Sequence, residues 1–232
     1  MGNVILTSCH LRHNYFVNVV ERICDVSLVI QEDKPGLTGE ALHTEKKYFS
    51  NGNKILAEVA RCEKGHLNSF QITEQIRDQK PDIIFVFGSG IIGSKIIEIP
   101  RLGCVNVHTG ITQHFRGVDS CFWAVHDDKP QGIGATLHFI DEGIDTGPII
   151  AQRRPILNIE DSLWDIFMKT CLVGFGVLEQ NIDRIKNKSI DITPGGNGKV
   201  YRMRNMSENV FKLANANLKR VITDYQVMYD KS

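Results

Sequence analysis

Residues 3–30 decide the fold and read NVILTSCHLRHNYFVNVVERICDVSLVI. Residues 3–7 predict a first strand. Through residues 11–24 the apolar side chains recur at steps of three and four, which indicates a helix. Residues 26–30 form a continuous apolar run that is typical of a parallel strand covered on both faces. Together these segments predict a βαβ unit.

Strand and helix signals continue to alternate through the middle of the chain. Further strands are predicted at residues 81–87, 102–107 and 134–140. A mobile connection is predicted at 34–44, which holds Pro35 and two glycines, and helices at 53–62 and 73–79. We therefore expect an α/β fold, a doubly wound and mostly parallel sheet with its site at the carboxyl ends of the strands.

The last third of the chain is predicted to be helical. Residues 161–186 form a long amphipathic pattern, in which Ser162 and Asp165 resemble a capping box. A Pro-Gly-Gly stretch at 194–196 then breaks the chain before a second helical pattern at 207–229. We expect a main domain at 1–190 and a short helical C-terminal appendage at 191–232.

Composition limits the classes of partner. Lys plus Arg and Asp plus Glu both number 27, so the net charge favours neither nucleic acid nor an anionic membrane, and we expect neither as a partner. The six cysteines include no Cys-x-x-Cys pair, which argues against a zinc cluster and a disulfide framework. No apolar stretch reaches the ~18 residues that span a bilayer. We expect a cytoplasmic protein without a metal.

An amide, an imidazole and a carboxylate lie near the ends of predicted strands. Alternation along residues 102–107 places Asn106 and His108 on the same face. Asp145 lies in a loop flanked by glycines, which can turn it toward that face. Such groups can jointly polarise a carbonyl, move a proton near neutral pH and orient the imidazole. We predict acyl transfer, with Asn106, His108 and Asp145 as catalytic residues.

Two other features invite a different interpretation. Residues 88–93 read GSGIIG after a strand and match the glycine pattern of dinucleotide sites. That fingerprint also needs an acidic residue at the end of the next strand, which here ends in Asn106 and His108. His114, His126 and His138 show no metal-ligand spacing, so we expect them at surface or strand positions.

Three segments resemble the folate-dependent formyltransferases. They are GCVNVH at 103–108, FRG at 115–117 and GATLHFIDEGIDTGPIIAQ at 134–152. The resemblance implies a Rossmann-like formyltransferase core, 10-formyltetrahydrofolate as formyl donor and an amine as acceptor. It also places Asn106, His108 and Asp145 on the family's catalytic positions.

The resemblance implies two further groups of site residues. For the folate these are Phe87, Gly88, Ser89, Gly90, Ile91, Ile140, Asp141 and Gly143. For the acceptor they are Cys9, Arg12, His13, Thr109 and Arg116. Arg12 and His13 lie at a predicted helix start, where free backbone N–H groups favour an anion such as a phosphate.

Two departures from the family bear on the acceptor. Residues 109–114 replace the family's usual Ser-Leu-Leu-Pro stretch, and residues 8–14 lack the glycine loop of the purine-pathway members. The chain is also short for the tRNA-binding barrel of methionyl-tRNA formyltransferases. We therefore expect the acceptor to be the amino group of a nucleotide-linked amino sugar. A glycinamide-ribonucleotide-type acceptor and a non-catalytic folate-binding regulatory module stay open, as does a homodimer.

Overall fold

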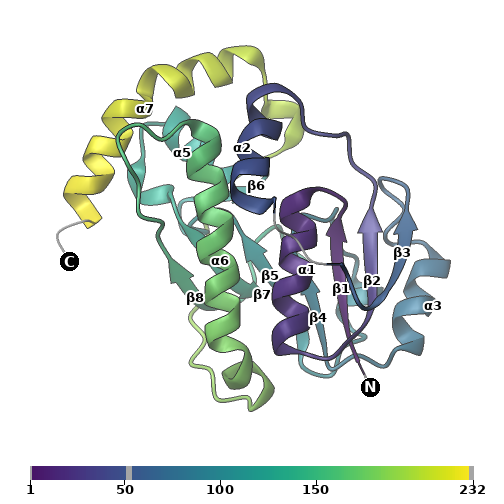
Figure 1. The fold of residues 1–232 in the computed structure, drawn as a ribbon. Coiled ribbons are helices and arrows are strands. Elements are labelled where there is room, and N and C mark those ends of the chain that lie inside the picture. Colours follow the sequence, from purple (N-terminus) through teal and green to yellow (C-terminus); the bar gives the residue numbers. More distant parts are fainter. Residues whose placement is uncertain (1, 51–53, 230–232) are drawn as a thin grey trace.

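The computed structural model describes residues 2–50 and 54–229 and is built around a seven-stranded sheet of order β3-β2-β1-β4-β5-β7-β8 (Figure 1). The strands are β1 (Asn3–Ser8), β2 (Val26–Glu32), β3 (Glu58–Cys62), β4 (Ile83–Val86), β5 (Gly103–His108), β7 (Ala135–Phe139) and β8 (Ile149–Arg153). The first five are parallel, whereas β7 and β8 are antiparallel to their neighbours. The predicted doubly wound, mostly parallel sheet is confirmed.

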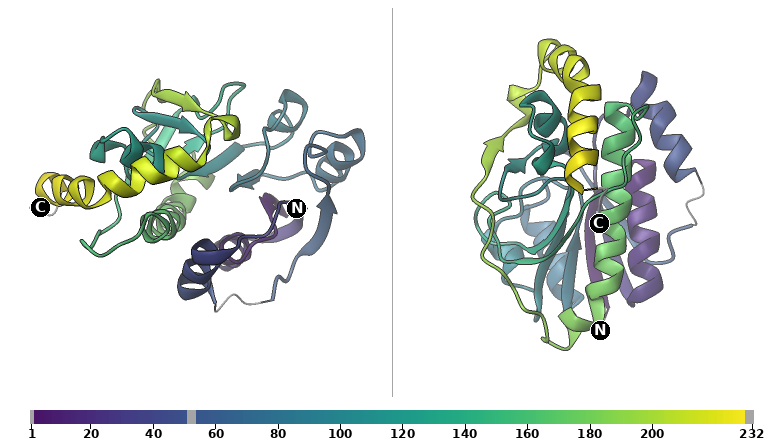
Figure 2. Two further views of the ribbon diagram at one scale, coloured as in Figure 1. Left: turned by 90° about the horizontal axis from the view of Figure 1, so that it is seen from above. Right: turned by 90° about the vertical axis from the view of Figure 1, so that its left-hand side faces the viewer.

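Helices cover both faces of the sheet (Figures 1 and 2). On one face lie α1 (Leu11–Ile23), α2 (Gly39–Phe49) and α6 (Leu163–Lys186), and on the other lie α3 (Phe70–Asp78) and α4 (Ser94–Ile97). Successive side chains of a strand point to opposite faces of the sheet, so each face has its own hydrophobic core. Ile5 packs in the core that contains Phe16 and Phe175. Leu6 packs in the core that contains Ile76.

The chain order sets the position of a crevice. From β1 the chain proceeds to β2 on one side, and it returns on the other side to β4. In open α/β sheets such a reversal separates the loops at the carboxyl ends of the strands, and ligands bind there. The loops after β1 and β4 flank this point, and β5 follows as the next strand.

Two predictions between residues 34 and 62 are wrong. The connection predicted at 34–44 is helical from residue 39, where α2 begins. The glycine at 39 stands at the start of a run of good helix formers, which continues the helix. The segment predicted as a helix at 53–62 contains strand β3, which pairs in parallel with β2; Asn53 lies outside the described residues. As an edge strand, β3 is mostly exposed and carries no apolar pattern.

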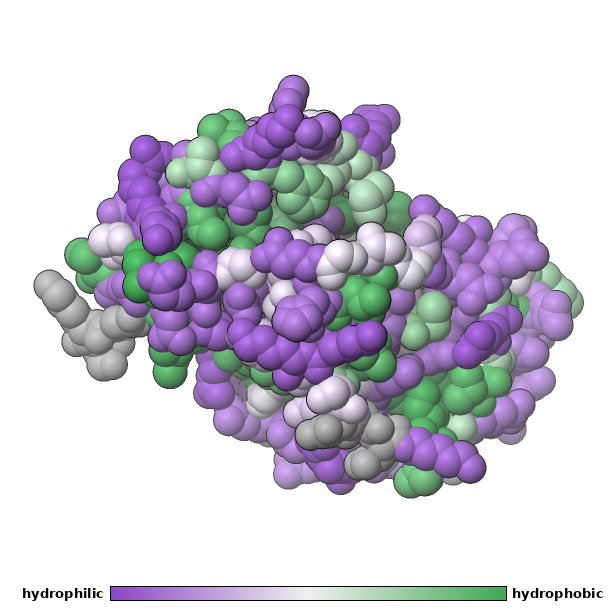
Figure 3. Space-filling view, turned by 45° about the horizontal axis from the view of Figure 1, so that its top comes forward, coloured by the Kyte–Doolittle hydropathy of each residue, from purple (hydrophilic) through white to green (hydrophobic). Residues whose placement is uncertain are grey.

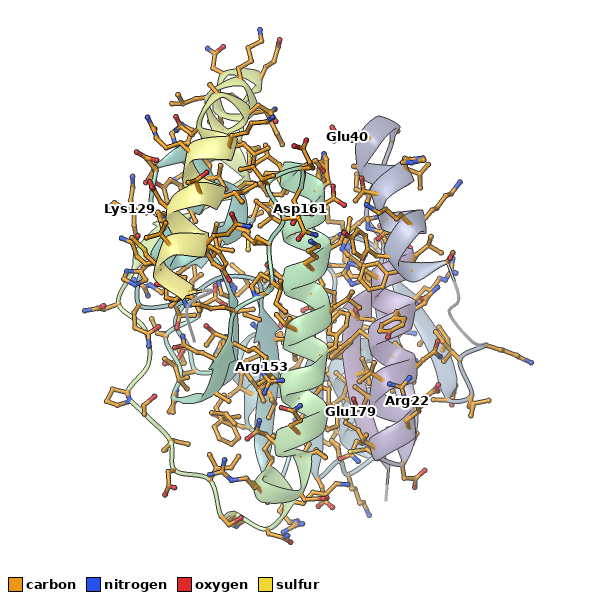
Figure 4. All side chains as sticks on the ribbon, turned by 60° about the vertical axis from the view of Figure 1, so that its left-hand side comes forward. Arg22, Glu40, Lys129, Arg153, Asp161 and Glu179 are labelled. Carbon is orange, nitrogen blue, oxygen red and sulfur yellow. The ribbon has the colours of Figure 1, made fainter. Side chains whose placement is uncertain are left out.

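The two C-terminal helices are confirmed. Helix α6 begins at the predicted capping box, with Ser162 and Asp165 bonded reciprocally, and an ion pair at 3.5 Å between Arg22 and Glu179 joins it to α1 (Figure 4). The last helix, α7 (Glu208–Tyr229), packs against α5 (Ser120–His126). Two short 3-10 turns, η1 and η2, span Pro130–Gly132 and Met203–Asn205.

The segment between α6 and α7 contains a strand that the sequence did not predict. Strand β9 (Lys199–Tyr201) pairs in parallel with β6 (Phe115–Gly117) and forms a separate two-stranded sheet. Among residues 2–50 and 54–229, no helix is long and apolar enough to cross a membrane.

Candidate active site

Four polar side chains meet near the carboxyl end of β5. Asn106 and His108 extend from the same face of β5, as alternation requires. Antiparallel pairing places His138 of β7 directly opposite Asn106. Asp145 reaches them from the loop between β7 and β8, and its backbone is left-handed, with φ of 50°.

The distances define one connected group. Asn106 Nδ2 lies 3.1 Å from His138 Nε2 and 3.5 Å from Asp145 Oδ1. Asp145 Oδ2 lies 3.3 Å from His108 Nδ1, and Asp145 Oδ1 lies 3.5 Å from His138 Nε2. The structure thus brings together the three residues that the sequence singled out and adds His138.

Hydrogen bonds assign the tautomer of His138. Its Nδ1 lies 2.7 Å from the carbonyl oxygen of Phe139, which can only accept, so Nδ1 carries the proton. Its Nε2 lies between the amide of Asn106 at 3.1 Å and the carboxylate of Asp145 at 3.5 Å, and can contact either group. His138 therefore helps to orient Asn106, and it lies in strand β7 with 2% exposure, which is the strand position of the two expected for it.

Burial and charge determine the protonation of His108 and Asp145. Burial lowers the pKa of His108, and the raising effect of the Asp145 carboxylate only partly offsets it. Burial alone would raise the pKa of Asp145, but His108, His138 and the Gly117 amide together hold that pKa well below its usual value. At neutral pH the pair is therefore an imidazole beside a carboxylate.

The second nitrogen of His108, Nε2, is the one that does not face Asp145. Its Nε2 is buried and has no hydrogen bond within residues 2–50 and 54–229. A Cβ added to Gly110 would lie 2.7 Å from this nitrogen, so a side chain at position 110 would crowd it. With Nδ1 directed at Asp145, Nε2 is the atom that can exchange a proton with a ligand.

The glycine turn after β4 is the first of two loops that sequence analysis assigned to the folate. Phe87 is buried at its base, Gly88 has a φ of 62°, and Ser89 donates within the turn to the carbonyl of Gly90. The backbone N–H of Gly90 donates to Glu32 at 2.7 Å, whereas the side chain of Ile91 is 76% exposed.

A second loop follows β7 and carries Ile140, Asp141 and Gly143. Asp141 accepts hydrogen bonds from the N–H of Gly143 at 3.1 Å and from Thr146 Oγ1 at 2.6 Å. The backbone N–H of Ile140 donates to the carbonyl of Cys104 in β5. These bonds shape the loop that ends in Asp145.

The turn after β1 carries the residues expected at an acceptor phosphate. Arg12 pairs with the buried Glu45, and the side chain of Arg12 is 12% exposed. His13 is 2% exposed and its Nδ1 lies 2.8 Å from the hydroxyl of Thr7. Burial and then Arg12 lower its pKa well below the usual value, so His13 is neutral. Cys9 is half-buried.

Lys34 was not predicted from the sequence as a site residue. It reaches the same region as the β1–α1 turn and donates to the carbonyl of Gly88. Burial has the largest effect on Lys34 and lowers its pKa from the usual value. The positive charge of Arg12 lowers that pKa further. Two cations therefore lie close to the turn after β1.

Thr109 and Arg116 lie on the segment that follows β5. The carbonyl of Thr109 accepts a hydrogen bond from the thiol of Cys121 at 3.2 Å. Arg116 donates to the carbonyls of Gly198 at 2.7 Å and Ile144 at 3.2 Å. Arg116 thus connects two loops, a contact that its sequence context did not predict.

The end of the molecule at the carboxyl ends of the strands is mixed in polarity. Figure 3 brings this end forward and shows separate hydrophobic patches between broad hydrophilic areas. Within the described ranges, no group of three or more His, Cys, Asp or Glu residues could hold a metal ion.

Curated relatives share a stated activity but not the length of this chain. The chain is 31% identical over 160 residues to a methionyl-tRNA formyltransferase from Myxococcus xanthus, a match of 67% of this chain and 49% of the relative. It is 29% identical over 170 residues to the one from Thermodesulfovibrio yellowstonii, covering 72% and 53%. The chain spans about half the length of these relatives.

A solved formyltransferase shares the fold over almost the whole chain. It is PseJ from Anoxybacillus kamchatkensis, in complex with UDP-4,6-dideoxy-4-formamido-L-AltNAc and tetrahydrofolate. The TM-score is 0.63 at 17% identity, and the match covers 95% of this chain and 100% of PseJ. The formyl transferase family model matches residues 20–172, which is more than half of the sequence. The chain therefore belongs to the formyl transferase family.

Proposed function

We propose that the chain transfers a formyl group from 10-formyltetrahydrofolate to the amino group of a nucleotide-linked amino sugar. The observation that carries the transfer is the contact of Asn106, His108 and Asp145 at one strand end. The amide can stabilise an oxygen that gains negative charge, and the imidazole and carboxylate can move a proton.

The folate donor supplies an amide-like formyl carbon. When the acceptor nitrogen bonds to that carbon, the carbonyl electrons move to the formyl oxygen and give a tetrahedral intermediate with negative charge on that oxygen. As this charge returns to re-form the carbonyl, the bond from carbon to folate N10 breaks. Asn106 Nδ2 carries two hydrogens, which face His138 at 3.1 Å and Asp145 at 3.5 Å, and the hydrogen on the longer contact can turn to the formyl oxygen when the folate is bound. His108 Nε2 takes a proton from the acceptor amine and can return it to N10. Asp145 orients the ring.

The two loops fit a folate donor. A pterin is flat, with polar edges and apolar faces. The exposed Ile91 offers an apolar face next to the turn at 88–90, whose carbonyl and amide groups lie outside the sheet. Gly90 lets the backbone approach Glu32, because a Cβ there would lie 2.9 Å from Glu32 Oε1. We place the folate along residues 87–91 and 140–143.

Gly90→Val is expected to weaken folate binding by about tenfold or more, which corresponds to ~1.4 kcal/mol. The branched side chain would push the turn away from Glu32 and displace the backbone that faces the pterin. Calorimetry with tetrahydrofolate measures the effect.

Gly36→Val is the matched control, because a Cβ at Gly36 has no atom within 4 Å. Equal folate affinity in the two variants would move the pterin away from this turn. NAD is expected to show no measurable binding, and micromolar affinity would support a dinucleotide site instead.

The acceptor assignment is supported by the type of ligand that similar structures hold. Beside PseJ, an N-formyltransferase from Helicobacter canadensis was solved with folinic acid and dTDP-3-aminofucose, and its TM-score is 0.66 at 20% identity. That match covers 97% of this chain and 82% of the other. In this chain we place the acceptor phosphates between Arg12 and Lys34, with Cys9 and Thr109 at the margin.

Arg12→Ala is expected to raise the KM of a nucleotide-sugar acceptor about tenfold while the KM of the folate changes little. One of the two cations near the turn would be lost, and the Nε of Arg12, which is buried without a partner in the described part of the chain, would no longer be offered to the ligand. The salt dependence of the acceptor KM should weaken as well.

Arg22→Ala provides the control, because Arg22 also lies on α1 and pairs with a glutamate, but at the opposite end of the helix, beside Glu179 (Figure 4). If Arg12→Ala leaves both KM values unchanged, the acceptor site lies elsewhere, and residues 110–114 are the next segment to test.

The experiment that tests the proposed function is a screen of folate consumption. 10-Formyltetrahydrofolate is supplied with UDP- and dTDP-linked amino sugars, glycinamide ribonucleotide or methionyl-tRNA, the acceptor class of the curated relatives. Turnover with an amino-sugar nucleotide supports the proposal, and turnover with either other acceptor replaces it. Folate binding without turnover on any acceptor would identify a non-catalytic binding module.

A further inference from the structure

A segment close to the C-terminus contacts the loop that carries Asp145. We call residues 193–201 (TPGGNGKVY) the strap. At its start, Thr193 exchanges two backbone hydrogen bonds with Ile149, of 2.9 and 3.0 Å. At its end lies strand β9. The strap therefore follows one side of the 143–149 loop.

The first connection between the strap and Asp145 runs through β6. Gly117 of β6 is the register partner of Tyr201 in β9, and the N–H of Val118 donates to the Tyr201 carbonyl at 3.0 Å. The N–H of Gly117 donates to Asp145 Oδ2 at 2.7 Å. This is the same carboxylate oxygen that faces His108.

The second connection is the guanidinium of Arg116. Its Nε donates to the carbonyl of Gly198 in the strap, and its Nη1 donates to the carbonyl of Ile144, the residue before Asp145. One planar side chain thus links both segments, and a lysine could not reproduce this fork geometry.

Backbone packing supplies a third connection. A Cβ on Gly195 would lie 1.6 Å from the carbonyl oxygen of Thr146, and one on Gly196 would lie 2.2 Å from that of Thr112. Any side chain at these positions must displace backbone. The glycines therefore let the strap lie directly against both loops beside the site.

The far end of the strap is fixed by aromatic packing. The ring of Tyr201 stacks on Trp123 of α5, with centroids 3.9 Å apart and an interplanar angle of 9°. Its hydroxyl donates to Asp127, which His126 also contacts at 2.7 Å. The strap is thus anchored to α5.

We propose that the strap is a positioning element of the active site, which holds Asp145 against His108 through Arg116, Gly117 and Gly195. The expected effect of the strap on turnover rests on the proposed function, whereas its effect on the position of Asp145 beside His108 does not. Asp145 adopts a left-handed backbone, which costs more than the right-handed regions even for aspartate, so contacts from neighbouring segments help to maintain it. Arg116 then acts on the loops rather than on the substrate.

The test compares Gly195→Ala with Gly176→Ala, a matched control whose Cβ has no atom within 4 Å. The imidazole of His108 is titrated by NMR in each variant, with a His108→Gln sample to assign its signal. Asp145 raises the pKa of His108, and the other groups that act on it are His138 and the Phe115 backbone. Displacing Asp145 should therefore move the titration midpoint of His108 to lower pH in the Gly195→Ala protein, and the midpoint should not move in the Gly176→Ala control.

Turnover gives the second readout. Gly195→Ala should lower kcat by about 10²-fold, because a misplacement of about 1 Å can cost that much. Added to Asp145→Asn, it should cost little more, since both changes remove the same contact. A folded Gly195→Ala protein with the control's His108 midpoint and kcat would overturn the proposal.

Two safeguards separate the possible failures. If Gly195→Ala does not fold, Arg116→Lys is measured in the same way and should show the same directions, and an unchanged His108 midpoint and kcat would count against the strap. The His108 titration needs no acceptor or turnover. A shifted midpoint in a protein that is inactive on every acceptor would support the strap and reject the proposed function.

Discussion

His108→Ala is expected to lower turnover at least ~10²-fold while the affinity for the folate stays within about tenfold. The buried Nε2 of His108 has no partner in the described ranges, so the ring contributes little to holding the loops that we assign to the folate. Its proton transfer matters only as the reaction proceeds. Single-turnover kinetics and folate calorimetry on the purified variant measure the two effects.

His66→Ala serves as the control for His108→Ala, because the side chain of His66 is 65% exposed and lies outside the site. A folded His108→Ala protein with turnover near that of the control would show that His108 is not a catalytic residue. Strongly weakened folate binding would instead indicate a structural role for the ring.

Asp145→Asn is expected to lower turnover by at least ~10²-fold and to move the acid limb of the pH profile. Burial lowers the pKa of His108 and the Asp145 carboxylate opposes that change, so the limb of the unaltered protein lies below the ordinary histidine value. Removing the negative charge leaves burial unopposed. The limb of the residual activity should therefore shift further toward low pH.

The measurement is kcat/KM against pH for the unaltered protein and for Asp145→Asn. Asp141→Asn is the control, since Asp141 lies in the same loop but contacts Gly143 and Thr146 rather than His108. A limb that moves toward high pH, or one that does not move, would mean that Asp145 does not set the protonation of His108.

The central part of the fold could be predicted because burial leaves a pattern in the sequence. Strands β1, β2, β4 and β5 are covered on both faces, so each appears as an apolar run. The positions of Asn106 and His108 at the end of such a run also indicated one shared face. These inferences depend only on local alternation.

Residues 34–62 were not predictable in the same way. Strand β3 is held by backbone pairing with β2 and buries few side chains, so its composition does not indicate a strand. Helix α2 begins at Gly39, immediately after a stretch whose proline and glycine favour a loop. In β3 the pairing with β2 outweighs local preference, whereas in α2 the helix formers after Gly39 outweigh the loop preference of the residues before it.

The rest of the site depends on contacts between distant segments. His138 meets Asn106 only because β7 pairs antiparallel to β5 in one register, and nothing in residues 134–140 alone specifies that partner. Had the pairing of β7 with β5 been assumed, alternation along β7 would have placed His138 on the same face as Asn106. The strap is glycine-rich, which locally predicts only a break in the chain.

The pairing of β6 with β9 has a consequence for the order in which the protein is built. The parallel strands β3, β2, β1, β4 and β5 all lie within the first 108 residues, and α6, which covers one face of them, is complete at residue 186. Tyr201, which pairs with Gly117, leaves the ribosome only later. A nascent chain that includes α6 but ends before the strap would therefore hold the sheet and its covering helices before Asp145 reaches its final geometry, and products truncated there should be compact but inactive.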